Sequence, residues 1–225
     1  MKIVFDSSAL ITVSQTCLSK CISSLKEKTG IEFFISPAVF SEVVSNPLGI
    51  RRFELNAVRL RELVEKKSIS VQELDRNSKE FFSKISALAN NSFSIKGKAL
   101  KIMHSGELEA LALANQLHAE IVAVDERTTR MLVENPFALR ASMEKKYSAQ
   151  VSENRQNILE LKNLFFQCGF VRSVELIALA FEKNALAGEI ENTKKGLEAA
   201  LYAAKFSGCS VSFSEIQDFL KGIRA

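Results

Sequence analysis

The stretch SGELEALALANQLHAEIVAVD, residues 105–125, limits the folds open to this chain more than any other part of the sequence. Apolar residues recur at helical spacing over residues 107–118, and Ser105 suits an N-cap, so a buried amphipathic helix is predicted there. Residues 121–124 form a short apolar run that ends in Asp125, as in a buried parallel strand. Ligands of open α/β sheets bind beyond the carboxyl ends of such strands. The stretch therefore predicts a wound α/β unit with acids at a helix start and at a strand end.

Further apolar runs alternate with helical patterns upstream and predict a parallel sheet with helices on both faces. A three-layer α/β/α fold follows from this alternation. Residues 90–101 are predicted to be a loop or the lead-in to a helix, and residues 137–146 fit either a helix or a final edge strand. The other predicted strands are Lys2–Phe5, Ile31–Ile35 and Ile69–Val71. The other predicted helices cover residues 9–28 (one or two helices, with a kink near 14–16), 38–44, 51–67, 77–89 and 126–133.

The last third of the chain reads differently, because it combines helical periodicity with no cluster of acids and no glycine-rich loop. Residues 147–153 are polar and are predicted to be a linker. We therefore expect an α/β domain over residues 1–146 and a helical C-terminal extension over residues 154–225. The helices predicted in the extension cover residues 154–168, 172–184, 191–206 and 213–223.

Composition is that of an ordinary water-soluble globular protein, with 47% hydrophobic and 25% charged residues. No apolar run reaches the roughly 18 residues of a spanning helix, and no signal peptide is recognised, so we expect a cytoplasmic protein with no membrane partner. The four cysteines are scattered without a Cys-x-x-Cys pair, which favours free thiols over a zinc site or disulfides.

Charge is distributed unevenly along the chain, although the net charge is only +4. Residues 51–101 hold twelve Lys and Arg against six Asp and Glu, whereas residues 151–225 are balanced at nine of each. A basic stretch beside an acidic pocket suits a polyanion gripped by its backbone, although a solvated helix face explains the pattern equally well.

Four acids fall at comparable positions in the predicted fold. Asp6 ends the first strand, Glu42 lies on the helix after the second, Glu107 starts a later helix and Asp125 ends the last clear strand. Taken singly, such acids are usually capping or turn residues. Together at one sheet edge they form a set of hard oxygen ligands that suits Mg²⁺ or Mn²⁺, and bound metal there could support hydrolysis of phosphate esters.

Four segments in this order resemble the PIN domain family, which comprises metal-dependent ribonucleases, including toxins of toxin–antitoxin pairs and RNA-processing endonucleases. The segments are VFDSSALI at 4–11, SPAVFSEVV at 36–44, GELEALALA at 106–114 and IVAVDERTTR at 121–130. The resemblance covers about residues 1–135. The long spacing between the second and third segments, and the C-terminal third, depart from a small toxin and favour a larger stand-alone or RNA-processing member.

The resemblance implies roles for individual residues. Asp6, Glu42, Glu107 and Asp125 would be the catalytic acids and metal ligands, and Glu126 would be an additional ligand. Ser8, next to the first acid, and Arg130, after the last acid, are expected to contact substrate. From the charge pattern, Arg51 and Arg52 in the basic stretch are expected to hold the RNA backbone.

These observations leave more than one function open. The first is a divalent-metal-dependent endoribonuclease with RNA as its partner, acting alone, as a homodimer, or under an antitoxin or other complex partner. The alternative is a catalytically silent PIN-like scaffold within an RNA-associated complex, docked through its C-terminal helices. A phospho-acceptor or nucleotide-binding α/β domain ranks below both, because the chain has no glycine-rich phosphate loop.

Overall fold

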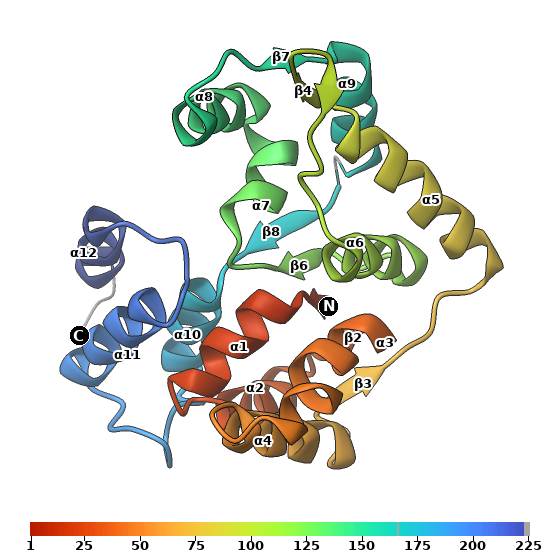
Figure 1. Ribbon diagram of the computed structural model, residues 1–225. Helices are drawn as coiled ribbons and strands as arrows, with labels where there is room; N and C mark the ends of the chain where they lie inside the picture. Colours follow the sequence, from red (N-terminus) through yellow and green to blue (C-terminus); the bar gives the residue numbers. More distant parts are fainter. Residues whose placement is uncertain (166, 223–225) are drawn as a thin grey trace.

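A five-stranded, all-parallel sheet in the order β3-β2-β1-β6-β8 forms the centre of the computed structural model (Figure 1), which describes residues 1–165 and 167–222. The α/β fold with a parallel sheet and a mostly helical C-terminal region is thereby confirmed. The strands are β1 (Lys2–Phe5), β2 (Glu32–Ile35), β3 (Ile69–Val71), β6 (Ile121–Ala123) and β8 (Gly169–Val171).

Helices cover both faces of this sheet (Figure 1), because the chain winds from β1 toward β3 first and later from β1 toward β8 in the opposite direction. One group, α1, α2, α4 and α10, packs together. On the other side, α6 packs on β1 and β6 and is covered by α5, and α9 packs on α5 in turn. The helices are α1 (Ser7–Gln15), α2 (Lys20–Thr29), α3 (Pro37–Phe40), the π-helix η1 (Ser41–Ser45), the 3₁₀-helix η2 (Pro47–Gly49), α4 (Glu54–Glu65), α5 (Arg76–Asn90), α6 (Ser105–Leu117), α7 (Arg127–Glu134), α8 (Pro136–Tyr147), α9 (Arg155–Leu164), α10 (Ser173–Glu182), α11 (Lys194–Phe206) and α12 (Phe213–Gly222).

Strand β1 holds the core together because it lies in the middle of the sheet and is covered on both faces. Its residues Val4 and Phe5 are fully buried, and Ile3 pairs with Phe33 of β2 on one side and with Ile121 of β6 on the other. The rings of Phe5 and Phe33 lie 5.5 Å apart. The three consecutive apolar residues Ile3–Phe5 are what burial of a central strand on both faces demands.

Residues 90–101, predicted as a loop or a helix lead-in, instead contain a β-hairpin of β4 (Phe93–Ile95) and β5 (Lys98–Ala99). Lys96 and Gly97 both have positive φ, at 49° and 76°, as a two-residue hairpin turn with the twist of its strands requires. Strand β7 (Ser152–Glu153) pairs antiparallel with β4, so the predicted linker is also partly a strand. Residues 136–147 are helical, which settles the open choice for that segment.

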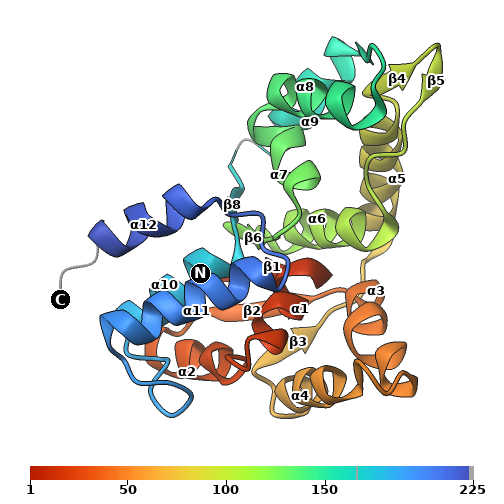
Figure 2. The same ribbon diagram turned by 60° about the vertical axis from the view of Figure 1, so that its left-hand side comes forward.

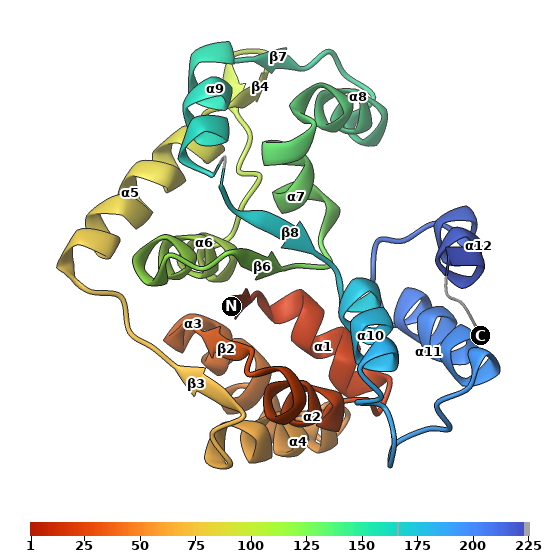
Figure 3. The same cartoon turned by 180° about the vertical axis from the view of Figure 1, so that it is seen from behind.

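The C-terminal region contributes a strand to the main sheet, which the prediction of an all-helical extension missed. Strand β8 pairs with β6 from Gly169 to Val171, and α10 starts directly after it (Figure 3). Only three residues form the strand, too few for a periodic signal to separate them from the helices on either side. The division into residues 1–146 and 154–225 stays a prediction about folding units, and the sheet itself spans both parts.

Smaller differences concern the ends of elements. Residues 9–28, predicted as one or two helices, form two, α1 and α2, which separate near the expected kink. His104 rather than Ser105 is the N-cap of α6. The predicted last helix is observed to Gly222, and its end at Ile223 lies outside the described residues. None of the described helices is both long and apolar enough to cross a membrane.

We predict that a chain cut after residue 150 loses its cooperative thermal unfolding transition, because β6 would become an exposed apolar edge without β8. A chain cut after residue 211 is the control. It lacks only α12, which packs on α11 at the outer side of the molecule (Figure 2), and should unfold cooperatively at a moderately lower temperature. Circular dichroism melting checks both, and a cooperative transition in the shorter chain would contradict the prediction.

Candidate active site at the carboxyl edge of the sheet

Asp6 lies at the carboxyl end of the central strand and is the most constrained of the candidate acids. Its backbone N–H donates to the carbonyl of Ala123 at 2.9 Å, so β1 and β6 end side by side. Its side chain caps α1 by accepting from the N–H of Ser8 at 3.1 Å. The residue is only 2% exposed. The acid is therefore fixed both by the sheet and by the helix that follows it.

Ser8 connects the ends of the two strands. Its hydroxyl donates to Asp6 Oδ2 at 2.5 Å and accepts from the backbone N–H of Asp125 at 3.0 Å. The hydroxyl thus orients the first acid relative to the last. Its predicted role in contacting substrate stays a prediction, and its bonds within the protein are those of a positioning residue.

Asp125 is held by the C-terminal region. Its Oδ1 accepts from the backbone N–H of Ser173 and its Oδ2 from the Ser173 hydroxyl, both at 2.7 Å. Ser173 is the first residue of α10, so the carboxylate also faces the positive end of that helix. The Ser210 hydroxyl donates to the Asp125 carbonyl at 2.6 Å. Asp125 is only 1% exposed, so the cost of burying its carboxylate is offset by donors of the protein itself.

Glu107 occupies the first turn of α6. Its carboxylate accepts from the N–H of His104 at 2.7 Å, closing a capping box, and from the hydroxyl of Thr129 on α7. Burial raises the pKa of Glu107 to about 7, and the charges of Glu126 and Asp6 add to the rise, while the two hydrogen bonds oppose it. This acid can therefore gain or lose a proton near neutral pH.

Glu42 reaches the same helix start from η1. A Cβ built on Gly106 would lie 2.6 Å from Glu42 Oε1 and 2.8 Å from Oε2, so the carboxylate rests against the glycine next to Glu107. Only a residue without a side chain allows this approach. Glu42 is exposed, unlike the other three acids, and has the most freedom to move.

The buried atom Asp6 Oδ1 has no hydrogen-bond partner within the described structure. Burial raises the pKa of Asp6 above its usual range, and the nearby charge of Asp125 raises it further. Ser8 and the backbone of Ser7 act in the opposite direction and lower it. An orphaned carboxylate oxygen beside a second acid is the setting that a bound cation would compensate.

The donor types and this orphaned oxygen fit a divalent cation held by Asp6 with Asp125, Glu107 or Glu42. A complete ligand set is not assembled, however, since the described residues contain no group of three His, Cys, Asp or Glu side chains that could hold a metal ion. Binding would therefore require the carboxylates to rearrange, and exposed Glu42 is the acid best able to do so.

The remaining predicted site residues lie around this edge. Glu126 is exposed at the N-cap of α7, close enough for its charge to raise the pKa of Glu107. Arg51 and Arg52 are exposed before α4, and the guanidinium of Arg52 lies over the ring of Phe53. Arg130 forms an ion pair with Glu134, one turn later on α7, at 3.4 Å.

Sequence reasoning missed Ser173, Thr129 and the steric role of Gly106. Thr129 and Gly106 stand inside the segments VDERTTR and GELEALALA, but nothing in those letters shows which acid each one serves. For Ser173, a signal exists in Arg172-Ser-Val-Glu175, where Glu175 accepts from the N–H of Arg172 as in a helix capping box. A helix start after the apolar run Gly169–Val171 could have indicated the missing strand.

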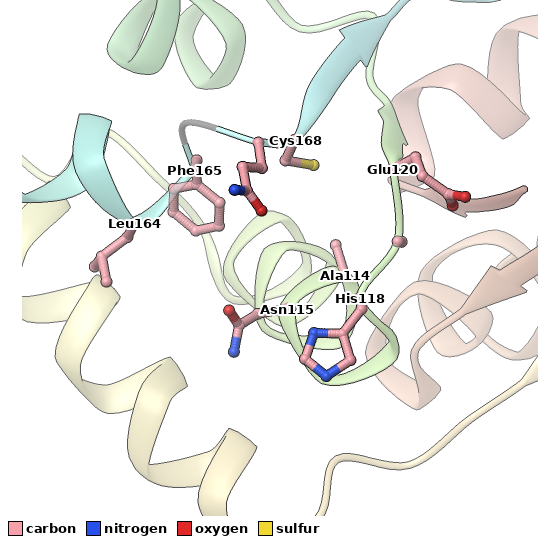
Figure 4. Close-up of a pocket in the computed structure, with 9 residues that line it drawn as sticks. Ala114, Asn115, His118, Glu120, Leu164, Phe165 and Cys168 are labelled. Atoms are coloured by element: carbon pink, nitrogen blue, oxygen red, sulfur yellow. The ribbon is translucent and has the colours of Figure 1, made fainter.

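A separate cavity of about 230 Å³ lies at the opposite end of α6 (Figure 4). It is lined by Asn115, His118, Glu120 and Cys168 among others. Burial raises the pKa of the Cys168 thiol to about 11, and Glu120 already accepts from the backbone N–H of Lys2 at 2.7 Å. None of the candidate acids lines this cavity, so it is not part of the acidic site.

Replacement of Glu107 by Gln should stabilise the metal-free protein at high pH. Because the folded pKa of Glu107 lies near 7, above its ordinary 4.5, the unfolded chain ionises first and stability falls as pH rises through this range. The free energy of unfolding of Glu107→Gln, relative to wild type, should rise by about 3 kcal/mol between pH 4.5 and 7. Below pH 4.5 the difference between the two proteins should not change with pH. Urea unfolding in EDTA measures this difference, and a gain that does not vary with pH would contradict it.

Comparison with known proteins gives one match. A family model described as the PIN domain matches residues 2–136, which is more than half of the 225-residue chain. Searches of the curated proteins and of the solved structures found no match. PIN domains are generally nucleases and typically use divalent metals, and the matched region contains all four candidate acids. The chain belongs to the PIN domain family.

Proposed function

We propose that this protein is a divalent-metal-dependent endoribonuclease that hydrolyses RNA phosphodiester bonds at the carboxyl edge of its sheet. The observation that carries the proposal is the buried, unpartnered Oδ1 of Asp6, next to Asp125 and within electrostatic reach of Glu107. A structural acid at this depth would be expected to have both oxygens satisfied by the protein. The family supports a nuclease, and RNA as the substrate is part of the proposal.

The proposal assigns a separate role to each residue of the site. Mg²⁺ or Mn²⁺, when bound, would activate water and offset the charge that develops on the phosphate. Asp6 would hold the cation through Oδ1 while Ser8 fixes its other oxygen. Glu107, at the start of α6, would be a further ligand of the cation. Arg51 and Arg52 would hold the sugar–phosphate backbone.

One observation favours the alternative of a catalytically silent scaffold. Both oxygens of Asp125 are already satisfied by Ser173, and no three acids converge among the described residues. In that case the acids would stabilise the fold alone and the C-terminal helices would dock to a partner. The two functions differ in whether metal binds at Asp6.

Asp6→Asn should abolish cleavage of labelled single-stranded RNA in Mg²⁺ or Mn²⁺, lowering the rate at least about 100-fold, because one cation ligand is lost. Asp218→Asn is the matched control, since Asp218 is an exposed acid on α12 and the chemical change is the same. Wild type should be inactive in EDTA. Metal-independent cleavage, or equal activity of the two variants, would contradict the assignment. Calorimetry that detects no metal binding would favour the scaffold.

Gly106→Ala tests the position of Glu42 without removing an acid. The new Cβ would meet the Glu42 carboxylate, whose flexible end must turn away, so we expect at least about a tenfold loss of activity. The melting temperature should change little, because alanine is the better helix former. Gly222→Ala, where a Cβ meets no atom within 4 Å, is the control. Full activity of Gly106→Ala would show that the observed position of Glu42 is not needed.

A further inference from the structure

A second cavity, of about 320 Å³, opens beside the acidic site, and Glu42 belongs to its wall. It is lined by residues of α1 on one side and of η1, η2 and α4 on the other. Figures 1 and 2 show α1 and α4 near each other at this side of the molecule. Glu42 therefore stands between the cavity and the start of α6, where its carboxylate touches Gly106. Glu42 is thus the residue that links this cavity to the acidic site.

The walls of the cavity are apolar and partly open to solvent. Ile50 is 49% exposed, Phe53 39% and Ile11 37%, and all three line the cavity above buried Leu60 and Ala57. A contiguous patch of exposed apolar side chains commonly marks a binding site on a soluble protein. Apolar walls with a few polar groups are also the usual make-up of a small-ligand site.

The polar groups of this cavity suit the edge of a nucleobase. Gln15, Asn46 and Asn56 line it, and amides carry both donors and acceptors, although the Asn46 oxygen already accepts from the Ser41 hydroxyl. Neutral amides of this kind match the mixed donors and acceptors of a base, whereas a phosphate or a carboxylate would require cations inside the cavity.

Cations lie at the mouth instead. Arg51 and Arg52 are exposed next to Ile50 and Phe53, and the Arg52 guanidinium lies 5.4 Å from the centre of the Phe53 ring. Single-stranded nucleic acids are bound by this combination of an aromatic platform and flanking positive charge. The charges complement phosphates on either side of a base, and a purely apolar peptide helix would gain nothing from them.

We propose that this cavity is a nucleobase subsite, in which a base flanking the cleaved phosphate stacks on Phe53 while Arg51 and Arg52 hold the adjoining phosphates. The inference rests on the proposed function and adds to it a cavity that binds a base of the substrate. A base paired within a helix remains stacked on its neighbours and cannot enter the cavity without paying for its extrusion.

Binding without cleavage tests this subsite. A labelled single-stranded oligoribonucleotide is titrated with protein in EDTA and followed by fluorescence anisotropy, with the same backbone carrying abasic positions as the second ligand. Phe53→Ala should weaken binding of the base-containing strand about 5- to 100-fold and leave the weaker binding of the abasic strand unchanged. Phe53→Trp should restore affinity, since it keeps an aromatic face. Phe137→Ala is the matched control, because Phe137 is an exposed phenylalanine on α8 outside the cavity.

The outcomes separate the subsite from the nuclease. Base-dependent binding that is lost in Phe53→Ala supports the subsite even if no metal gives cleavage, in which case only the proposed function fails. Equal affinity of Phe53→Ala and wild type, or equal loss for both strands, overturns the subsite while leaving cleavage untouched. A Phe53→Ala variant that binds RNA normally but no longer self-associates in sedimentation would also overturn it and assign the surface to a protein partner.

Discussion

The arrangement of this protein depends on two buried carboxylates that end neighbouring strands. Asp6 and Asp125 lie where β1 and β6 finish, and Ser8 joins them by donating to one side chain and accepting from the backbone of the other. Two acids at such depth are costly unless donors or cations compensate them. The fold supplies donors to three of their four oxygens and leaves Asp6 Oδ1 without one.

The C-terminal region participates in this compensation. Strand β8 extends the sheet, and its continuation delivers Ser173 to Asp125. Arg172 then bonds to Glu175 and Glu215, and so ties α10 to α12. Burial alone would raise the pKa of Glu215, but hydrogen bonds from Ser212 and Arg172 lower it to about 2. The segment beyond the matched family region thus supports the edge that carries the acids.

Much of this fold could be predicted from local pattern. Apolar strands ending in Asp6 and Asp125, and the helix that begins near Glu107, are short-range signals that the structure confirms. Strand β8 escaped because it is short, lies between helices and pairs with β6, which is distant in sequence. The Lys96-Gly97 hairpin escaped because its strands, of three and two residues, lie in a polar and basic stretch. Which donor serves which acid depended on the same distant contacts, as Ser173 shows for Asp125.

The most direct test of this account is a crystal structure of the protein grown with Mn²⁺ and measured for anomalous scattering. The account predicts a manganese peak within bonding distance of Asp6 Oδ1, with Glu42 turned toward the other acids to complete the ligands. Absence of a peak at Asp6, with Asp125 and Glu107 in their metal-free bonds at saturating Mn²⁺, would contradict the claim that these acids form a metal site.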